Sequence, residues 1–348
     1  MTIIRLLLFP FALLYDLATR IRNYLYDIGH KSSFQFDTPI IAVGNLNVGG
    51  SGKTPMIEYL IMLLKNNRRV ATLSRGFKRS TIGYKAAGEM DTAQTIGDEP
   101  FQILRKFGRE IKVIVGEDRV LAIPHILQEF PETEVILLDD AFQHRSVKAH
   151  LNILLTEYFN PFYRDFVLPA GRLRESSRGA RRADIIVVTK CPERISDEEK
   201  KITTREIQKY AGNKPVFFSG IQYQPPIALG NQQELLDSIV LVSGIAKEKS
   251  ILDFCKINRS VLRHFNFPDH HRYTTDDLRR IEAYCQTLTG PYSIVTTEKD
   301  MVKLIRPDLS DFLDRLPWFY IPIRQVFLQD GMKFDELVHN VVANASRG

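Results

Sequence analysis

The segment IIAVGNLNVGGSGKTP, residues 40–55, constrains the fold of this chain more than any other stretch. An apolar run typical of a strand leads through a glycine-rich turn into the apolar periodicity of a helix, which is the context of a phosphate-binding loop. Gly49, Gly50 and Gly52 permit an open, left-handed backbone whose N–H groups can point at phosphate oxygens. The residues expected to contact a nucleotide phosphate are Asn47, Val48, Gly49, Gly50, Ser51, Gly52, Lys53 and Thr54.

Asn47 is the departure from the usual pattern G-x-x-x-x-G-K-[ST], which has glycine at this position. Because asparagine tolerates a positive φ, we expect Asn47 to keep the geometry that glycine would allow. Lys53 can then reach the β- and γ-phosphates of a nucleotide, and the Thr54 hydroxyl can bind Mg²⁺. The alternative is an ordinary glycine-rich turn between a strand and a helix.

The other apolar runs predict an α/β fold of the phosphate-loop NTPase type. Each run is continuous rather than alternating, which is typical of a mostly parallel sheet with helices on both faces. Ligands bind at the carboxyl ends of such strands. Strands are expected over residues 38–43, 69–74, 111–116, 134–140, 151–155 and 184–190, and a helix over 55–67.

A second, smaller α/β domain is expected after the proline-containing stretch 215–226. The 348 residues exceed one comfortable core, which favours two domains. The later strands are expected over 239–244, 292–300 and 318–323, with a helix over 274–288 that Thr274 or Thr275 can cap. The expected division is a membrane-associating segment 1–30, a phosphate-loop domain 31–220, and a second domain 221–348 with linker strands.

The apolar run within the first thirty residues is too short to cross a bilayer. The longest uncharged run is Leu6 to Tyr15, whereas a spanning helix needs about 17–25 apolar residues. No small-residue cleavage site of a signal peptide follows. An amphipathic segment fits better, with Arg20 and Arg22 at lipid head groups and the leucine and phenylalanine side chains in the acyl boundary. The alternative is a helix packed on its own protein.

Two acidic pairs are candidates for metal and proton chemistry. Asp139 and Asp140 end an apolar strand, where phosphate-loop enzymes hold Mg²⁺, and a cation would relieve the repulsion between adjacent carboxylates. Gln143, His144 and Arg145 follow at the same sheet edge. The alternative for these three residues is a polar loop without a role in the site. Asp98 and Glu99 lie in the turn TIGDEP and are candidates for the base or positioning group that a phosphoryl transfer needs.

Basic residues gather near the ends of the expected strands. Arg75, Arg119, Arg172 and Arg174 can clamp phosphates bidentately. Arg178, Arg181 and Arg182 are more typical of a solvated or membrane-facing run. His270 and His271 in FPDHHRY suggest a single catalytic histidine with a satisfied neighbour rather than a metal pair.

Composition excludes little. The formal charge of +6 suits a nucleic acid, a phospholipid or a phosphorylated substrate equally. The three cysteines are odd in number and scattered, which argues against a disulfide framework or a cysteine metal site and favours a reducing compartment.

The ordered set of motifs resembles the lipid A 4′-kinase family, the tetraacyldisaccharide 4′-kinases. The motifs run over most of the chain: VGNLNVGGSGKTP, LSRGFKR, GDEP, VGEDR, LLDDAFQHR, LPAGRLRE, VVTKCP, FPDHHRY and TTEKDMVKL. The family's own phosphate loop also departs from the usual pattern at its first glycine, as Asn47 does here.

The resemblance implies transfer of the ATP γ-phosphate to the 4′-hydroxyl of a tetraacylated disaccharide 1-phosphate at the cytoplasmic face of the inner membrane, by a peripheral protein. It implies two domains joined by a two-stranded linker, with the site between them. Asp98 corresponds to the base, supported by His270 or, because the pair is ambiguous, His271. Glu99, Asp139 and Asp140 would serve Mg²⁺ with Thr54, and Arg75, Arg119, Arg172 and Arg174 would face phosphates.

Three other functions fit the sequence less well. A GTPase switch would call for an N-K-x-D-like element, but VVTKCPE has Pro192 where the aspartate belongs. A nucleic-acid-binding ATPase is suggested only by the positive charge, since no stacked-aromatic basic motif is present, so no nucleic-acid partner is expected. A soluble small-molecule kinase would not need the apolar amino-terminal segment.

Overall fold

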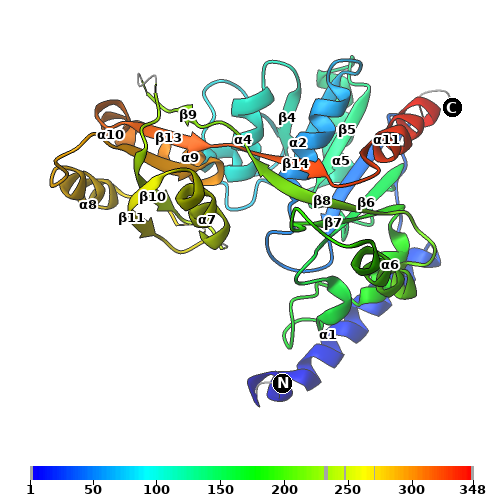
Figure 1. Ribbon diagram of the computed structural model, residues 1–348. Helices are drawn as coiled ribbons and strands as arrows, with labels where there is room; N and C mark the ends of the chain where they lie inside the picture. Colours follow the sequence, from blue (N-terminus) through cyan, green and yellow to red (C-terminus); the bar gives the residue numbers. More distant parts are fainter. Residues whose placement is uncertain (1–2, 231–233, 247, 270, 346–348) are drawn as a thin grey trace.

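The computed structural model describes residues 3–230, 234–246, 248–269 and 271–345. Within these residues, nine strands form one sheet and five form another. Figure 1 shows the two sheets with their helices next to each other, and helix α1 (Ile3–Asp27) projecting away from both.

The larger sheet is mostly parallel, in the order β14-β8-β7-β6-β1-β5-β2-β4-β3. β1 lies at its centre and pairs in parallel with β5 and β6, while the edge strands β3 and β14 are antiparallel to their neighbours. The strands are β1 (Ile40–Asn45), β2 (Val70–Ser74), β3 (Lys85–Ala86), β4 (Lys112–Val115), β5 (Val135–Asp139), β6 (Leu151–Glu157), β7 (Ile185–Thr189), β8 (Val216–Tyr223) and β14 (Ile323–Phe327).

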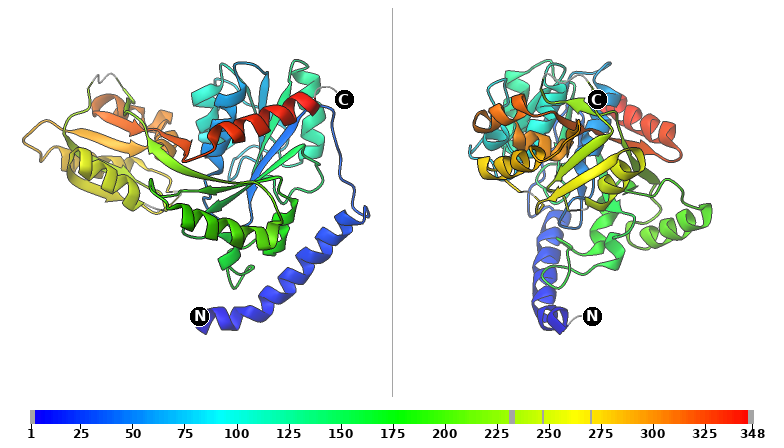
Figure 2. Two further views of the ribbon diagram at one scale, coloured as in Figure 1. Left: turned by 45° about the vertical axis from the view of Figure 1, so that its right-hand side comes forward. Right: turned by 60° about the vertical axis from the view of Figure 1, so that its left-hand side comes forward.

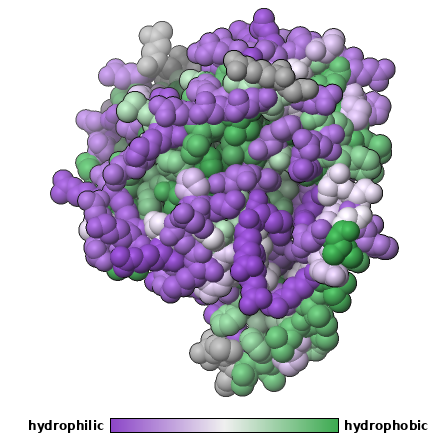
Figure 3. Space-filling view, turned by 90° about the vertical axis from the view of Figure 1, so that its right-hand side faces the viewer, coloured by the Kyte–Doolittle hydropathy of each residue, from purple (hydrophilic) through white to green (hydrophobic). Residues whose placement is uncertain are grey.

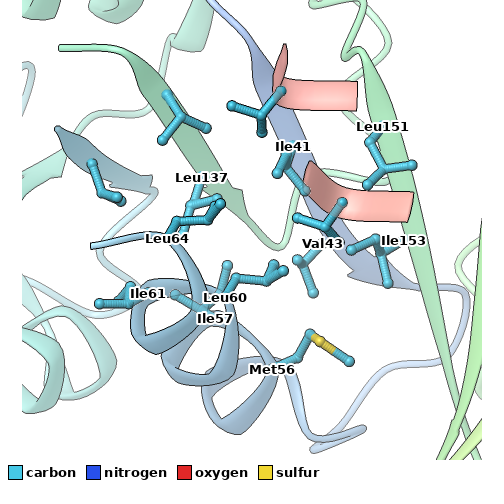
Figure 4. Packing of buried hydrophobic residues seen from close by; sticks show 14 of the residues in the cluster. Ile41, Val43, Met56, Ile57, Leu60, Ile61, Leu64, Leu137, Leu151 and Ile153 are labelled. Atoms are coloured by element: carbon cyan, nitrogen blue, oxygen red, sulfur yellow. The ribbon is translucent and has the colours of Figure 1, made fainter. Parts of the chain in front are cut away.

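Helices cover both faces of this sheet because successive apolar residues of its strands point to opposite sides. Ile41 and Val43 pack with α2 on one face, as Figure 4 shows, whereas Ile40 and Ala42 pack with α5 on the other. The expected fold class is thereby confirmed. The helices around the sheet are α2 (Lys53–Leu64), α3 (Ala93–Ile96), α4 (Asp98–Phe107), α5 (Arg119–Glu129), α6 (Asp197–Ala211) and α11 (Gly331–Ala345), with short 3₁₀ turns η1 (Phe162–Arg164) and η2 (Ser177–Arg182).

The smaller sheet has the order β11-β10-β12-β13-β9 and is also mostly parallel. Its apolar strands are covered by α8 and α10 on one face and by α7 on the other. Thr274 caps α8, and its side chain accepts a hydrogen bond from the Asp277 backbone N–H. The elements are β9 (Ile227–Ala228), β10 (Ser238–Ser243), β11 (Ser260–Asn266), β12 (Ser293–Thr297), β13 (Trp318–Ile321), α7 (Glu248–Asn258), α8 (Thr275–Cys285), α9 (Glu298–Leu304), η3 (Pro307–Leu309) and α10 (Ser310–Arg315).

The chain leaves the larger sheet through β8 and returns to it through β14, which pairs with β8 in antiparallel fashion (Figure 1). Helix α11 then packs on the larger sheet through Phe334, Val338 and Val342, and Figure 2 shows it lying across the sheet's face. These two elements fall within the range 221–348 that the sequence assigned to a second domain. They join the larger sheet because their apolar side chains complete its core.

The ends of several elements differ from the sequence expectation. Helix α2 begins at Lys53 rather than Pro55, so the loop's lysine is already helical. The run 318–323 is divided between β13, in the smaller sheet, and the start of β14 in the larger. Helix α1 continues through Pro10.

Candidate active site

The loop between β1 and α2 opens at the carboxyl edge of the larger sheet. Gly49 and Gly52 have φ of 111° and 88°, a region that side chains other than glycine rarely adopt. The expected left-handed backbone is therefore confirmed at these two glycines. It is wrong for Gly50 and Asn47, which do not have positive φ.

Asn47 has a different role from the one its tolerance of positive φ suggested. Its side-chain amide donates to Asp165 Oδ2 at 3.3 Å, and its backbone forms an isolated bridge with Leu173. The next backbone N–H, of Val48, donates to the Arg172 carbonyl at 2.7 Å. The loop is thus held against the segment 165–174, and a glycine at position 47 would lose the amide contact.

The ammonium group of Lys53 lies between two oxygen acceptors at the base of the loop. It donates to Asn45 Oδ1 at 3.3 Å and lies 3.7 Å from Asp140 Oδ1. Lys53 is buried, so its charge acts in a poorly hydrated place where electrostatic interactions are strong. Thr54 follows on α2 and is half-buried.

The two aspartates at the end of β5 have opposite electrostatic environments. Burial, with repulsion from Glu99, raises the pKa of Asp139 to about 7, although Lys53 opposes this. Burial also disfavours the charged form of Asp140, but Lys53 and Arg174 outweigh it and lower the Asp140 pKa. Asp140 has φ of 48°, an unusual backbone conformation that tends to occur at functional sites.

Of the four candidate phosphate-binding arginines, Arg119 and Arg174 contact the end of β5, Arg75 lies near Arg119, and Arg172 pairs elsewhere. The buried Arg119 Nη2 donates to the Asp139 carbonyl at 2.8 Å, while Arg174 Nη1 donates to the Asp140 carboxylate at 2.9 Å. Arg172 is exposed and pairs with Asp165 at 3.0 Å. Arg75 follows β2, is exposed, and is close enough to Arg119 to lower its pKa, alongside the larger effect of burial.

Asp98 and Glu99 are the first two residues of α4 and are half-buried. They follow Gly97, whose φ is 95° and whose hydrogen-only side chain faces the backbone of Gly76. A Cβ at Gly97 would lie 3.2 Å from the Gly76 carbonyl carbon, so the GDEP turn can approach the SRGF turn closely only with glycine here. The Asp98 carboxylate has no hydrogen-bond partner in the described part of the chain.

Several buried polar atoms near this edge have no hydrogen-bond partner among the described residues. Buried polar groups are nearly always paired, so such atoms mark a place where a ligand, an ion or water completes the site. They are Ser51 Oγ, Ser74 Oγ, Arg119 Nε, Asp139 Oδ1 and His144 Nε2. Burial and the neighbouring arginine Arg119 lower the His144 pKa to about 4, so this imidazole is neutral at pH 7.

The histidines of FPDHH come from the smaller unit. His270 lies outside the described residues. His271 Nε2 is 2.9 Å from Asp277 Oδ2, and its ring stacks on Phe267 with centroids 4.5 Å apart. Its ring is therefore engaged in holding the start of α8.

Sequence reasoning missed Asn23 and Glu175, which link α1 to the phosphate loop together with Gln143 and Arg182. The buried Glu175 accepts from Asn23 at 2.7 Å, from Gln143 at 3.2 Å and from both terminal nitrogens of Arg182. Gln143 also donates to the Asn45 carbonyl at 2.8 Å. The only signal for Glu175 was its place in LPAGRLRE, because its partners are distant in sequence.

Helix α1 exposes most of its apolar side chains. Leu7 is 68% exposed and Phe11 62%, and Figure 3 shows apolar residues gathered on the part of the molecule that projects below the polar body. Its other side contacts the protein, where Tyr15 Oη donates to the Arg174 carbonyl at 3.1 Å. In the described ranges, no helix is long and apolar enough to cross a membrane. Nor do three or more His, Cys, Asp or Glu side chains in these ranges converge as a metal site.

The parallel sheet, the glycine loop with its buried lysine and the desolvated carboxylates define a phosphate-loop nucleotide-binding enzyme. The family model for tetraacyldisaccharide-1-P 4′-kinase (LpxK) matches residues 4–343. The chain belongs to this family of kinases, as its motifs suggested.

Individual relatives agree over nearly the whole length. The chain is 44% identical to tetraacyldisaccharide 4′-kinase of Flavobacterium johnsoniae over 341 residues, 96% of each chain. It is 41% identical to that of Bacteroides thetaiotaomicron over 362 residues, 98% of this chain and 94% of the other. A crystal structure of LpxK from Aquifex aeolicus in complex with ATP matches with a TM-score of 0.76 and 29% identity, covering 98% of this chain and 100% of that one.

Proposed function

We propose that the protein transfers the γ-phosphoryl group of ATP to the 4′-hydroxyl of a tetraacyldisaccharide 1-phosphate, in the biosynthesis of lipid A. Membership of the kinase family supports this reaction, as does the ATP bound to the related LpxK. The observation that carries it is the convergence of the buried Lys53 with Asp139 and Asp140 beside unpartnered polar atoms. A phosphate-bearing ligand would supply the partners that these buried polar atoms lack.

In this proposal, residues 47–54 hold the nucleotide. Backbone N–H groups of the loop surround its phosphates, and Lys53 leaves Asn45 and Asp140 to contact the β- and γ-phosphates. The stabilisation is largely electrostatic, because the donors are already placed and partly desolvated.

Mg²⁺ suits the oxygen ligands at the end of β5 and at the starts of α2 and α4. Asp139 Oδ1 is buried without a partner, and the charge of Glu99 already disfavours a second negative charge beside it, so a cation would relieve both costs. Thr54, Glu99, Asp139 and Asp140 would hold it directly or through water. When bound, the cation supplies positive charge to the phosphate oxygens.

Asp98 is the proposed base for the acceptor. Its half-buried carboxylate takes the proton of the 4′-hydroxyl as the hydroxyl oxygen bonds to the γ-phosphorus and the bond to ADP breaks. His270, or His271 in its place, would support this base from the smaller unit. His271 is already bonded to Asp277, which favours His270 for the catalytic role.

We further propose that the substrate's own phosphate meets Arg75, Arg119, Arg172 and Arg174. The chain would work as the three parts 1–30, 31–220 and 221–348, the last of which is tied to the larger sheet through β14 and α11. The exposed apolar side of α1 suits a peripheral position on the cytoplasmic face of the inner membrane. An acceptor with four acyl chains is held at such a surface, so α1 would bring the site to it.

The test is incubation of the protein with γ-labelled ATP and tetraacyldisaccharide 1-phosphate in detergent micelles. We expect label in the lipid, strictly dependent on the acceptor. Label appearing only as free phosphate, at the same rate with and without lipid, would identify an ATPase and contradict the proposal. The Lys53→Ala variant controls for a contaminating kinase.

A further inference from the structure

A second cavity lies apart from the candidate active site, between the later half of α1 and the turn η2. Its volume is about 360 Å³, which is within the range of small-ligand sites. None of the residues proposed to hold the nucleotide, the metal or the substrate lines it. The lining residues are Thr19, Arg20, Asn23, Tyr24, Asp27, Arg145, Ser176, Arg178, Gly179, Arg181 and Arg182.

The lining is strongly cationic, with five arginines and a single acidic residue, Asp27. Three of the arginines are neutralised within the protein: Arg20 pairs with Asp16, Arg145 with Asp27, and Arg182 with Glu175. These pairs fix the walls of the cavity.

Arg178 and Arg181 differ from the other three arginines. Both are exposed, and neither guanidinium has an acidic partner among the residues that the structure describes. Each presents a planar set of N–H donors that matches the oxygens of a phosphate group. The unbalanced charge of the cavity therefore resides on these two side chains.

The cavity also lies beside the apolar surface of α1. Tyr24 lines it and is 61% exposed, and Ile21, in the preceding turn, is also exposed. Aromatic side chains favour the boundary between head groups and acyl chains, while arginines extend toward the head groups. A helix lying in the membrane surface through Leu13, Leu14 and Leu17 would hold the cavity at the depth of lipid phosphates.

We propose that this cavity binds the phosphate head group of an anionic phospholipid of the bilayer, a lipid that is not the kinase substrate. The apolar face of α1 supplies attraction to any bilayer, and the pair Arg178 and Arg181 adds a preference for negatively charged lipid. The site would orient the protein on the membrane, because it fixes the end of α1 that is tied to Glu175 through Asn23.

The test measures co-sedimentation of the full chain with phosphatidylcholine vesicles, with and without phosphatidylglycerol, in the absence of ATP and acceptor. The double variant Arg178→Gln/Arg181→Gln removes the unpaired guanidinium groups and leaves the neutralised pairs intact. Arg279→Gln/Arg280→Gln on α8 is the control, since it removes the same charge from exposed positions of the smaller unit.

We expect the cavity variant to bind phosphatidylglycerol vesicles roughly tenfold to thirtyfold more weakly than the unmodified protein. Its binding to pure phosphatidylcholine should not change, and the α8 control should keep its preference for anionic lipid. Equal losses in both variants would attribute the preference to overall charge and overturn the site.

A further arm separates this lipid from the substrate. In micelles without phosphatidylglycerol, the cavity variant should have the KM of the unmodified protein for tetraacyldisaccharide 1-phosphate. A raised KM would assign the cavity to the substrate's phosphate and overturn the proposal. Because the sedimentation arms use neither ATP nor acceptor, their outcome is independent of whether the proposed kinase reaction is correct.

Discussion

Asp98 and Lys53 occupy the two positions at which single side chains matter most to the proposed reaction. Asp98 begins α4 and has no hydrogen-bond partner among the described residues, whereas Lys53 begins α2 and is bound by Asn45 and Asp140. One would act on the acceptor and the other on the nucleotide. Their replacement should therefore have separable effects.

We predict that Asp98→Ala abolishes phosphorylation of the lipid with ATP binding largely kept, while Lys53→Ala weakens both. A general base contributes about 10²- to 10⁴-fold to the rate, so kcat of the Asp98 variant should fall by at least about 10²-fold. Labelled-lipid assays and ATP titration by calorimetry measure the two effects. Normal turnover in the Asp98 variant would remove it from the role of base.

The second residue-scale prediction concerns Asp139, whose pKa is about 7 in the folded protein because of burial. A carboxylate with a raised pKa stabilises the fold below its ordinary pKa and loses that contribution as pH rises through 7. In ligand-free protein with EDTA, Asp139→Asn should gain at least about 1 kcal/mol relative to the unmodified protein between pH 5 and pH 8.

Urea unfolding at the two pH values measures the effect of Asp139→Asn. The exposed Asp276→Asn on α8 is the control, and its stability difference should not change with pH. If the difference in unfolding free energy between Asp139→Asn and the unmodified protein were the same at pH 5 and pH 8, Asp139 would be ionised at both pH values in the folded chain. Asparagine at 139 should nevertheless lower kinase activity, since stability and function oppose each other at desolvated sites.

At the scale of elements, α1 has two sides with different tasks. One side is tied to the body by Tyr15, Arg22 and Asn23, and the other exposes leucines and phenylalanine. The sequence offered membrane contact and self-packing as alternatives. In the structure, one side of α1 packs on the protein, and its apolar side stays exposed and available for membrane contact.

Replacing Leu13, Leu14 and Leu17 together with Gln should release the protein from phosphatidylcholine vesicles without lowering its unfolding midpoint. Each side chain is more than half exposed, so the substitutions remove little packing from the folded state. They do remove apolar area that the helix would bury in the bilayer, worth about 25 cal/mol per Å². Vesicle flotation measures the binding. Ile257→Gln on α7, which is 83% exposed, is the control, and equal binding of both variants would exclude α1 as the membrane contact.

At the scale of the whole molecule, one buried charge network joins the two sheets. Lys106 of α4 donates to Glu58 of α2 at 2.6 Å and to Glu298 of α9 at 2.9 Å. Glu298 also accepts from the Ile323 N–H at the start of β14. Burial and the charge of Glu298 raise the pKa of Glu58 to about 7, although Lys106 opposes this.

We predict that Lys106→Met destabilises the protein by roughly 3 kcal/mol at pH 8, because two buried carboxylates lose their counter-charge. Without Lys106 the Glu58 pKa rises further, so the variant's deficit should shrink as pH falls and Glu58 becomes protonated. Urea unfolding at pH 5.5 and pH 8 tests this, with Lys209→Met, from an exposed pair worth about 0–1 kcal/mol, as the control. A deficit independent of pH would show that Lys106 does not change the protonation of Glu58 between pH 5.5 and pH 8.

The sequence by itself determined the class of fold, the phosphate loop, the acidic strand end after β5 and the family, because these depend on local patterns. A run of buried strand residues, a glycine with positive φ and a helix cap are each specified within a few neighbouring positions. The expected strands and the cap of α8 accordingly lie close to where the sequence indicated, whereas the strands β3, β8, β9, β11 and β14 were not expected.

Only the tertiary structure decided what Asn47 does, how Glu175 is buried, and that β14 and α11 return to the larger sheet. Asn47 meets Asp165 across 118 residues and Asn23 meets Glu175 across 152, and no local pattern encodes such pairs. The raised pKa of Asp139 and the link from Lys106 to two other helices likewise arise from burial and packing. Those properties belong to the assembled chain, because desolvation exists only once distant segments have excluded water.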